Sequence, residues 1–94
     1  MEEDARIGPP ASHVLEENVR EDVLLYDTGK EEFVSLNSTA GDVWRLATGE
    51  LTVDGIVDKL ASSYQVPADS IRADVAATVE QLIGAGLLQT GTDS

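Results

Sequence analysis

Three short runs in the first half of the chain, at positions 12–16, 22–27 and 32–36, combine apolar residues with polar ones. Successive side chains of a β-strand point to opposite faces, so each run can turn apolar residues toward a core. A turn containing Gly29 separates the second run from the third, and glycine tolerates the positive φ that tight turns often need. The pattern therefore predicts three strands, the last two joined as a hairpin.

The second predicted strand has apolar side chains on both faces, with Val23 and Leu25 on one and Leu24 and Tyr26 on the other. This favours a central strand that is covered on one side and partly covered on the other. The third predicted strand begins at a pair of glutamates, and charge of this kind discourages a sheet edge from pairing with other chains. We therefore expect the third strand to lie at an edge.

The second half of the chain changes to a helical period. Apolar residues recur three and four positions apart in residues 38–48, 53–64 and 68–85, which predicts three helices. Asn37 or Ser38 is a suitable N-cap for the first helix, and Thr52 for the second.

The predicted helix ends are marked by glycine. Gly49 is expected just after the first helix and Gly86 just after the third, where a residue in the left-handed conformation commonly ends a helix. Leu87 follows Gly86, as in a Schellman ending.

Strands followed by helices indicate an α+β domain with the helices on one face of an antiparallel sheet. The last two helices, joined by a short linker, are also compatible with a helix-turn-helix. Residues 1–11 combine an acidic start with Gly8-Pro9-Pro10 and little apolar content, so we expect a disordered tail there and a second one at residues 90–94. The folded domain would then span residues 12–89.

Composition narrows the classes of partner. The 94 residues include 18 acidic and 6 basic side chains, a formal net charge of −12 at pH 7. Such a charge repels nucleic-acid phosphates and anionic lipid headgroups, so we expect neither as a partner. The chain has no cysteine, no run of about 18 apolar residues and no apolar signal segment at its start, which favours the cytoplasm.

Candidate catalytic residues are few. His13 is the only histidine, and the sequence offers it no acidic or histidine partner at the spacing of a metal site. Asp54 and Asp58 lie four positions apart on one predicted helix face, which is typical of a solvated face rather than of an acid–base pair. The sequence therefore predicts a non-catalytic protein with no metal and no cofactor.

A Leu-Asn-x-Thr-Ala segment at residues 36–40 leads into Val43-Trp44, and Gly86-Leu87-Leu88 closes the last helix. The wider pattern is Leu25-Tyr26-Asp27, Gly29, Phe33, Leu46 and Gly49, then Ile56, Leu60, Tyr64-Gln65-Val66, Asp74-Val75 and Leu82. Over roughly residues 12–89, this combination resembles PqqD-like proteins, a family that includes stand-alone RiPP recognition elements.

The resemblance implies a winged-helix-like domain that binds the leader peptide of a ribosomally synthesised precursor. In the family the leader adds as an extra strand to the third strand and lies in the cleft between that strand and the third helix. Small free-standing members act beside a separate leader peptidase and a separate macrocyclase in lasso-peptide biosynthesis. The same size fits the PqqD-type chaperone of pyrroloquinoline quinone biosynthesis, so both pathways stay open.

Carried over by position, the resemblance assigns the peptide-binding strand to residues 32–36 and the cleft wall to residues at or beside the apolar stripe of the third helix. Arg72 would meet a leader carboxylate and Asp74 a leader lysine, with Glu31 and Glu32 as other acceptors for a cation. The predicted peptide-binding residues are Glu32, Phe33, Val34, Ser35, Leu36, Arg72, Asp74, Val75, Ala76 and Val79.

Two functions from other classes fit parts of the pattern. A winged helix could bind DNA, but the third predicted helix has Asp69, Asp74 and Glu80 against Arg72 alone, so it should repel a DNA groove. An acyl or peptidyl carrier protein would match the size and acidity, with Ser70 as the phosphopantetheine site. Carrier serines begin a second helix near the middle of the chain, whereas Ser70 begins the last long helix.

Overall fold

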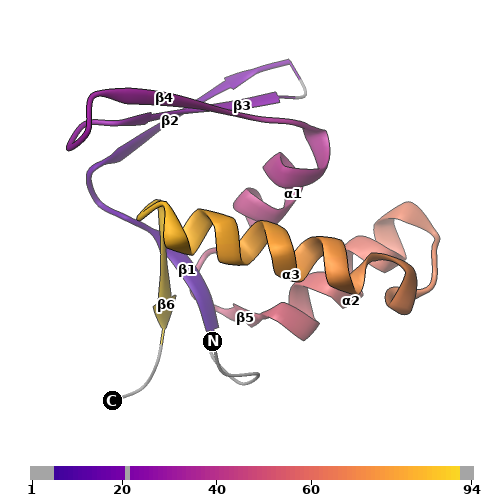
Figure 1. Ribbon diagram of the computed structural model, residues 1–94. Helices are drawn as coiled ribbons and strands as arrows, with labels where there is room; N and C mark the ends of the chain where they lie inside the picture. Colours follow the sequence, from indigo (N-terminus) through magenta and orange to yellow (C-terminus); the bar gives the residue numbers. More distant parts are fainter. Residues whose placement is uncertain (1–5, 21, 92–94) are drawn as a thin grey trace.

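An antiparallel sheet of three strands forms one layer of the computed structural model, which describes residues 6–20 and 22–91 (Figure 1). Its strands are β2 (Val14–Val19), β3 (Asp22–Asp27) and β4 (Glu32–Leu36), in the order β2-β3-β4. The bounds predicted for β3 and β4 are confirmed. The range 12–16 is wrong for β2, because pairing with β3 continues to Val19 opposite Asp22.

The two faces of this sheet differ as expected for a central strand that is covered on one side and partly covered on the other. Val23 and Leu25 are fully buried on the face toward the helices, here called the inner face, and Leu36 is 6% exposed there. Leu24 and Tyr26 are only half-buried on the opposite, outer face. No helix covers the outer face in the part of the chain that the structure describes (Figure 1).

The turn between β3 and β4 is held by a buried carboxylate rather than by a glycine conformation. Asp27 is 2% exposed, and its Oδ1 accepts hydrogen bonds from the backbone N–H of Gly29 at 2.9 Å and of Lys30 at 3.1 Å. The positive φ expected at Gly29 is found at Glu31, at 55°. An aspartate that bonds the backbone two residues ahead fixes a turn without needing a left-handed residue at that point.

Three helices follow, α1 (Ser38–Leu46), α2 (Val53–Tyr64) and α3 (Ala68–Gly84). The predicted N-caps are confirmed for the first two. Asn37 accepts from the Ala40 N–H at 2.9 Å, and Thr52 accepts from the Gly55 N–H at 3.2 Å.

Helix α1 ends at Leu46, before the predicted boundary at residue 48, and Gly49 is not its terminating residue. An N-terminal segment crosses the helix end at this point: Gly49 N–H donates to Ile7 O at 2.8 Å. The crossing is so close that a Cβ on Gly8 would lie 2.0 Å from Ala47 O. Only glycine permits this approach, and Gly8 and Gly49 both adopt positive φ there.

Helix α3 has the predicted Schellman ending. Gly86 adopts φ of 78°, its N–H donates to Ile83 O at 2.9 Å, and Leu87 N–H donates to Leu82 O at 3.0 Å. Leu87 is 2% exposed, so the chain turns back into the core directly after the helix.

A second three-stranded sheet, not predicted from the sequence, packs on the far side of the helices. Its order is β5-β1-β6, with β1 (Arg6–Pro10), β5 (Leu51–Thr52) and β6 (Leu88–Gly91).

The predicted N-terminal tail is therefore wrong for residues 6–11. Ile7 is fully buried, and Ala11 N–H donates to Leu87 O at 2.9 Å. The prolines are tolerated because β5 pairs only with Arg6 and Ile7, and the register with β6 shifts between Ile7 and Pro10. Residues 90–91 likewise belong to β6, whereas residues 1–5 and 92–94 lie outside the described residues.

One apolar core lies between the two sheets and among the helices. It contains Ile7 from β1, Val23 and Leu25 from β3, Trp44 from α1, and the stripe of α3. The buried members of that stripe are Val75, Val79 and Leu82. The α+β class, with three helices after an antiparallel three-stranded sheet, is thus confirmed. No helix in residues 6–20 and 22–91 is long and apolar enough to cross a membrane.

Candidate functional site

Strand β4 leaves one of its edges unpaired. It pairs with β3 along its whole length, from Val23 opposite Leu36 to Asp27 opposite Glu32. In the described chain no strand pairs with its other side. Such an edge presents a row of backbone N–H and C=O groups that can pair with a further strand.

A cleft of about 430 Å³ opens between the end of β4, the start of α1 and the side of α3. It is lined by Leu36, Asn37, Thr39, Ala40, Asp74, Ala77, Thr78, Gln81 and Leu82. Its apolar part comes from Leu36 and Leu82, which are 6% and 4% exposed, together with two alanines. The cleft can therefore receive small or apolar side chains from a peptide beside β4.

A single side chain ties the hairpin to the helix at the other end of β4. Lys30 Nζ, in the β3–β4 turn, donates to Ala85 O at the C-terminal end of α3, at 3.2 Å. A cation at this end also interacts favourably with the partial negative charge of the helix terminus. Strand β4 is thus flanked by α3 from Lys30 at one end to the cleft beside Leu36 at the other.

The structure places the five predicted strand residues as expected on β4, but on different faces. Leu36 is buried beside the cleft and Val34 is half-buried on the inner face. Phe33 points to the outer face and is 70% exposed, so it does not line the cleft. Glu32 and Ser35 are exposed.

The structure places most of the predicted helix-wall residues away from this cleft. Val75 and Val79 are 1% and 0% exposed and belong to the core. Arg72 pairs with Asp54 at the start of α2, so it lies on the flank of α3 that faces α2. Ala76, one turn later, is partly buried and does not line the cleft. Only Asp74 is placed at the cleft as predicted.

The cleft wall comes from the other flank of the α3 stripe, where Ala77, Thr78 and Gln81 join Asp74. An apolar stripe on a helix has two flanks, and periodicity alone does not say which of them faces the sheet. The opposite charges of Arg72 and Asp54, on successive helices, are the signal that could have indicated which flank faces α2. They place the flank that contains Arg72 against α2.

His13 has an acidic neighbour that its sequence position did not suggest. Its Nε2 lies 3.4 Å from Asp27 Oδ1, because β2 and β3 pair Val14 with Asp27. The Thr28 hydroxyl donates to the His13 carbonyl at 2.6 Å and so is not aimed at the ring. This cluster joins the ends of two strands, and in the described residues no group of three or more His, Cys, Asp or Glu converges as a metal site.

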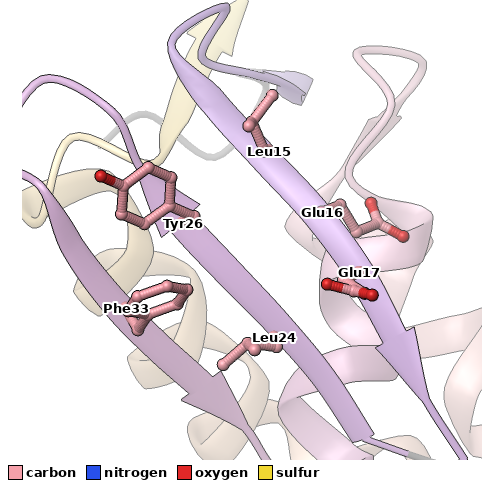
Figure 2. A pocket seen from close by; sticks show the side chains of 6 residues that line it. All are labelled: Leu15, Glu16, Glu17, Leu24, Tyr26 and Phe33. Atoms are coloured by element: carbon pink, nitrogen blue, oxygen red, sulfur yellow. The ribbon is translucent and has the colours of Figure 1, made fainter.

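A second hollow, of about 570 Å³, lies on the outer face of the sheet and was not anticipated from the sequence (Figure 2). It is lined by Leu15, Glu16, Glu17, Leu24, Tyr26 and Phe33. Leu15 is 59% exposed and Phe33 70%, which is unusual for side chains of this size. The sequence signal for this hollow was the presence of apolar residues on both faces of β3.

The sequence and fold can now be compared with known proteins. The fold is similar to that of TbiB1 in complex with the TbiA(beta) leader peptide, with a TM-score of 0.78 and 19% identity, covering 89% of this chain and 98% of that one. It is also similar to lasso peptide synthetase B1 complexed with the leader peptide, with a TM-score of 0.77 and 21% identity, covering 90% and 99%. A search of curated proteins gave no match.

The family comparison covers most of the domain. Residues 15–88 match the family model of coenzyme PQQ synthesis protein D (PqqD). The matched segment runs from β2 to the start of β6 and so includes the free edge of β4 and the cleft beside α3. This chain therefore belongs to the PqqD family.

Proposed function

We propose that this protein binds the leader segment of a ribosomally synthesised precursor peptide by adding it as a strand to β4. The observation that carries the proposal is the free edge of β4 beside the cleft lined by α3. Both similar solved structures are complexes with a leader peptide, which supports a leader peptide as the ligand of this protein.

The geometry suits strand addition. The backbone of β4 supplies hydrogen bonds that do not depend on the peptide's sequence, and pockets for alternate side chains supply selectivity. Peptide side chains that point inward would enter the cleft floored by Leu36 and Leu82. Because the side chain of Ala77 on the cleft wall is only a methyl group, it leaves room for a larger side chain of the peptide.

Charge favours a peptide with basic or neutral residues near the cleft. Asp74 lies on the cleft wall, and Glu31 and Glu32 lie exposed at the start of β4. Lys30 is engaged at the end of α3 and Arg72 at Asp54, and no cation lines the cleft among the described residues. A leader lysine beside Asp74 is therefore favoured, and a leader carboxylate beside Arg72 is not proposed.

The role proposed for the complex is presentation, not chemistry. The protein would hold the leader in the cytoplasm while separate enzymes, a leader peptidase and a macrocyclase, act on the rest of the precursor. Lasso-peptide biosynthesis is favoured by the similarity to a lasso peptide synthetase B1. The family description favours a second candidate, a PqqD-type chaperone for the precursor of pyrroloquinoline quinone.

Fluorescence anisotropy tests the proposal and separates the two candidates. The probes are fluorescein-labelled leaders of a lasso precursor and of a pyrroloquinoline quinone precursor from the same genome, with a scrambled leader as control. We expect saturable binding of the lasso leader only. Saturable binding of the quinone leader alone would select the second candidate, and failure of both leaders to bind would overturn leader binding.

A further inference from the structure

We infer that Phe33 selects an apolar side chain on the outward-facing side of the bound peptide, opposite to the side that enters the cleft. This inference rests on the proposed function and names a second specificity contact for it. The contact would extend a row of apolar side chains that crosses the outer face of the sheet and stops at the free edge of β4.

The row is defined by strand register. Leu15 on β2 lies opposite Tyr26 on β3, and Tyr26 lies opposite Phe33 on β4. The ring centroids of Tyr26 and Phe33 are 4.7 Å apart at an interplanar angle of 38°. Figure 2 shows these side chains on the same side of the three strands. We call Leu15, Tyr26 and Phe33 the outer row.

The outer row is incomplete at the edge of β4. Phe33 has Tyr26 on one side, and within the described residues no strand lies on the other, so 70% of its surface is exposed. Opposed side chains on neighbouring strands lie close enough to contact each other. A peptide strand on β4 would therefore set one of its outward side chains against Phe33.

Strand geometry then gives the peptide a two-sided pattern. Successive side chains of a strand point to opposite faces, so the neighbours of the residue opposite Phe33 would turn inward, and the inward residue opposite Leu36 would reach the cleft. The next outward residue of the peptide lies opposite Ser35, whose small polar side chain would not select an apolar residue. The predicted pattern is one aromatic or aliphatic outward residue, flanked by residues that face inward.

A second copy of this chain is a poorer occupant of the outer face. Glu17 pairs with Leu24 and lines the same hollow as the outer row, so face-to-face copies would bring the Glu17 carboxylates close to each other. Each copy also has a formal net charge of −12. Like charges across a contact are unfavourable, whereas a peptide at the β4 edge need not approach the glutamates on β2.

The experiment is a set of double-mutant cycles between the protein and the labelled leader that binds it. Each leader residue in turn is replaced by serine, and affinity is measured against the wild-type protein and against Phe33→Ser. We expect Phe33→Ser to weaken binding by about three- to ten-fold, with the loss coupled to a single leader position. Leu15→Ser is the matched control: it lies in the same row two strands from the edge and should leave affinity unchanged.

The outcomes separate this inference from the proposed function. If the wild-type protein binds the leader but Phe33→Ser binds every variant as tightly, the Phe33 contact is overturned and leader binding stands. Equal losses for Phe33→Ser and Leu15→Ser would also overturn it, because the effect would then not be located at the edge. Light scattering that shows a dimer dispersed by Phe33→Ser would assign the outer row to a second copy instead.

Discussion

The indole of Trp44 on α1 donates a hydrogen bond from Nε1 to Glu16 Oε1 on β2, at 2.7 Å. Trp44 is 2% exposed, so its N–H has little access to water, and Glu16 is the acceptor that makes its burial acceptable. The bond joins the first helix to the strand farthest from the free edge of β4. Glu16 thus helps to stabilise a core residue, although the sequence alone suggests an ordinary surface glutamate.

Replacing Glu16 by alanine is expected to destabilise the protein by about 1–3 kcal/mol, because a buried donor loses its partner. Glu16→Gln keeps an acceptor and should recover much of this loss. The matched control is Glu17→Ala, at the next residue of β2, whose side chain lies on the outer face. This change should alter stability by no more than about 0.5 kcal/mol. Urea unfolding followed by tryptophan fluorescence measures all three, and equal effects of Glu16→Ala and Glu17→Ala would contradict the assignment.

Ile7 tests whether the N-terminal strand belongs to the fold. Ile7→Ala should lower the free energy of unfolding by about 2–5 kcal/mol, since the side chain is fully buried in the core. Ile7→Val removes one methylene and should cost about 0.5–1.5 kcal/mol, which keeps the test informative if the alanine variant does not fold. Arg6→Ala, at an exposed neighbour, serves as control, and a tail without structure would make all three variants equal.

Proline substitutions in β4 distinguish its paired side from its free side. Backbone N–H groups alternate in direction along a strand, so of Val34 and Ser35 one donates toward β3 and the other toward the free edge. Of Val34→Pro and Ser35→Pro, one should unfold the sheet, and the other should fold normally but lose leader binding. Circular dichroism reports folding and anisotropy reports binding. Two folded variants that both bind normally would exclude strand addition to β4.

Filling the cleft should block the peptide without disturbing the fold. Ala77→Leu adds a large side chain to the cleft wall, where overpacking against an inward peptide side chain typically costs about 1–3 kcal/mol of binding free energy. Ala73→Leu is exposed on the same helix outside the cleft and should have no effect. Arg72→Ala should also leave affinity unchanged, because Arg72 pairs with Asp54 on the side of α2. If Arg72→Ala weakened binding and Ala77→Leu did not, the peptide would lie against the flank of α3 that the sequence first suggested.

Tyr64 gives the protein a pH dependence at the alkaline end. Burial, together with the hydrogen bond to the Asp42 carboxylate, raises the pKa of the Tyr64 phenol to about 12. Because the folded pKa lies above the ordinary value of 10.0, the stability that Tyr64 adds is complete below pH 10 and is lost as the pH rises through 12. The stability difference between wild type and Tyr64→Phe should shrink over this range. A difference that stays constant would contradict the prediction.

The strands at Asp22–Asp27 and Glu32–Leu36 and the helix Val53–Tyr64 were predictable because local pattern and tertiary environment agree there. Alternation, a turn and a capping threonine each act over a few residues. The same holds for the end of α3, where Gly86 and Leu87 specify the Schellman motif by themselves.

The parts that could not be predicted depend on contacts between distant segments. Residues Gly8-Pro9-Pro10 have the composition of a linker, and only pairing with β6 and the crossing over Ala47 make them a strand. In the same way, periodicity alone does not say which flank of the α3 stripe faces the cleft. The contact between Arg72 and Asp54 assigns one flank to α2. The free edge of β4 was predictable, but the cleft wall beside it was not.

The pairing of Arg6 with Gly91 brings the points where the chain enters and leaves this domain side by side. Both points lie on the face of the molecule away from the sheet that contains β4 (Figure 1). A fusion partner, a surface tether or a fluorescent tag attached at either point would therefore leave the strand edge open. A larger enzyme or a solid support could likewise be joined at either point without a change in the β4 edge.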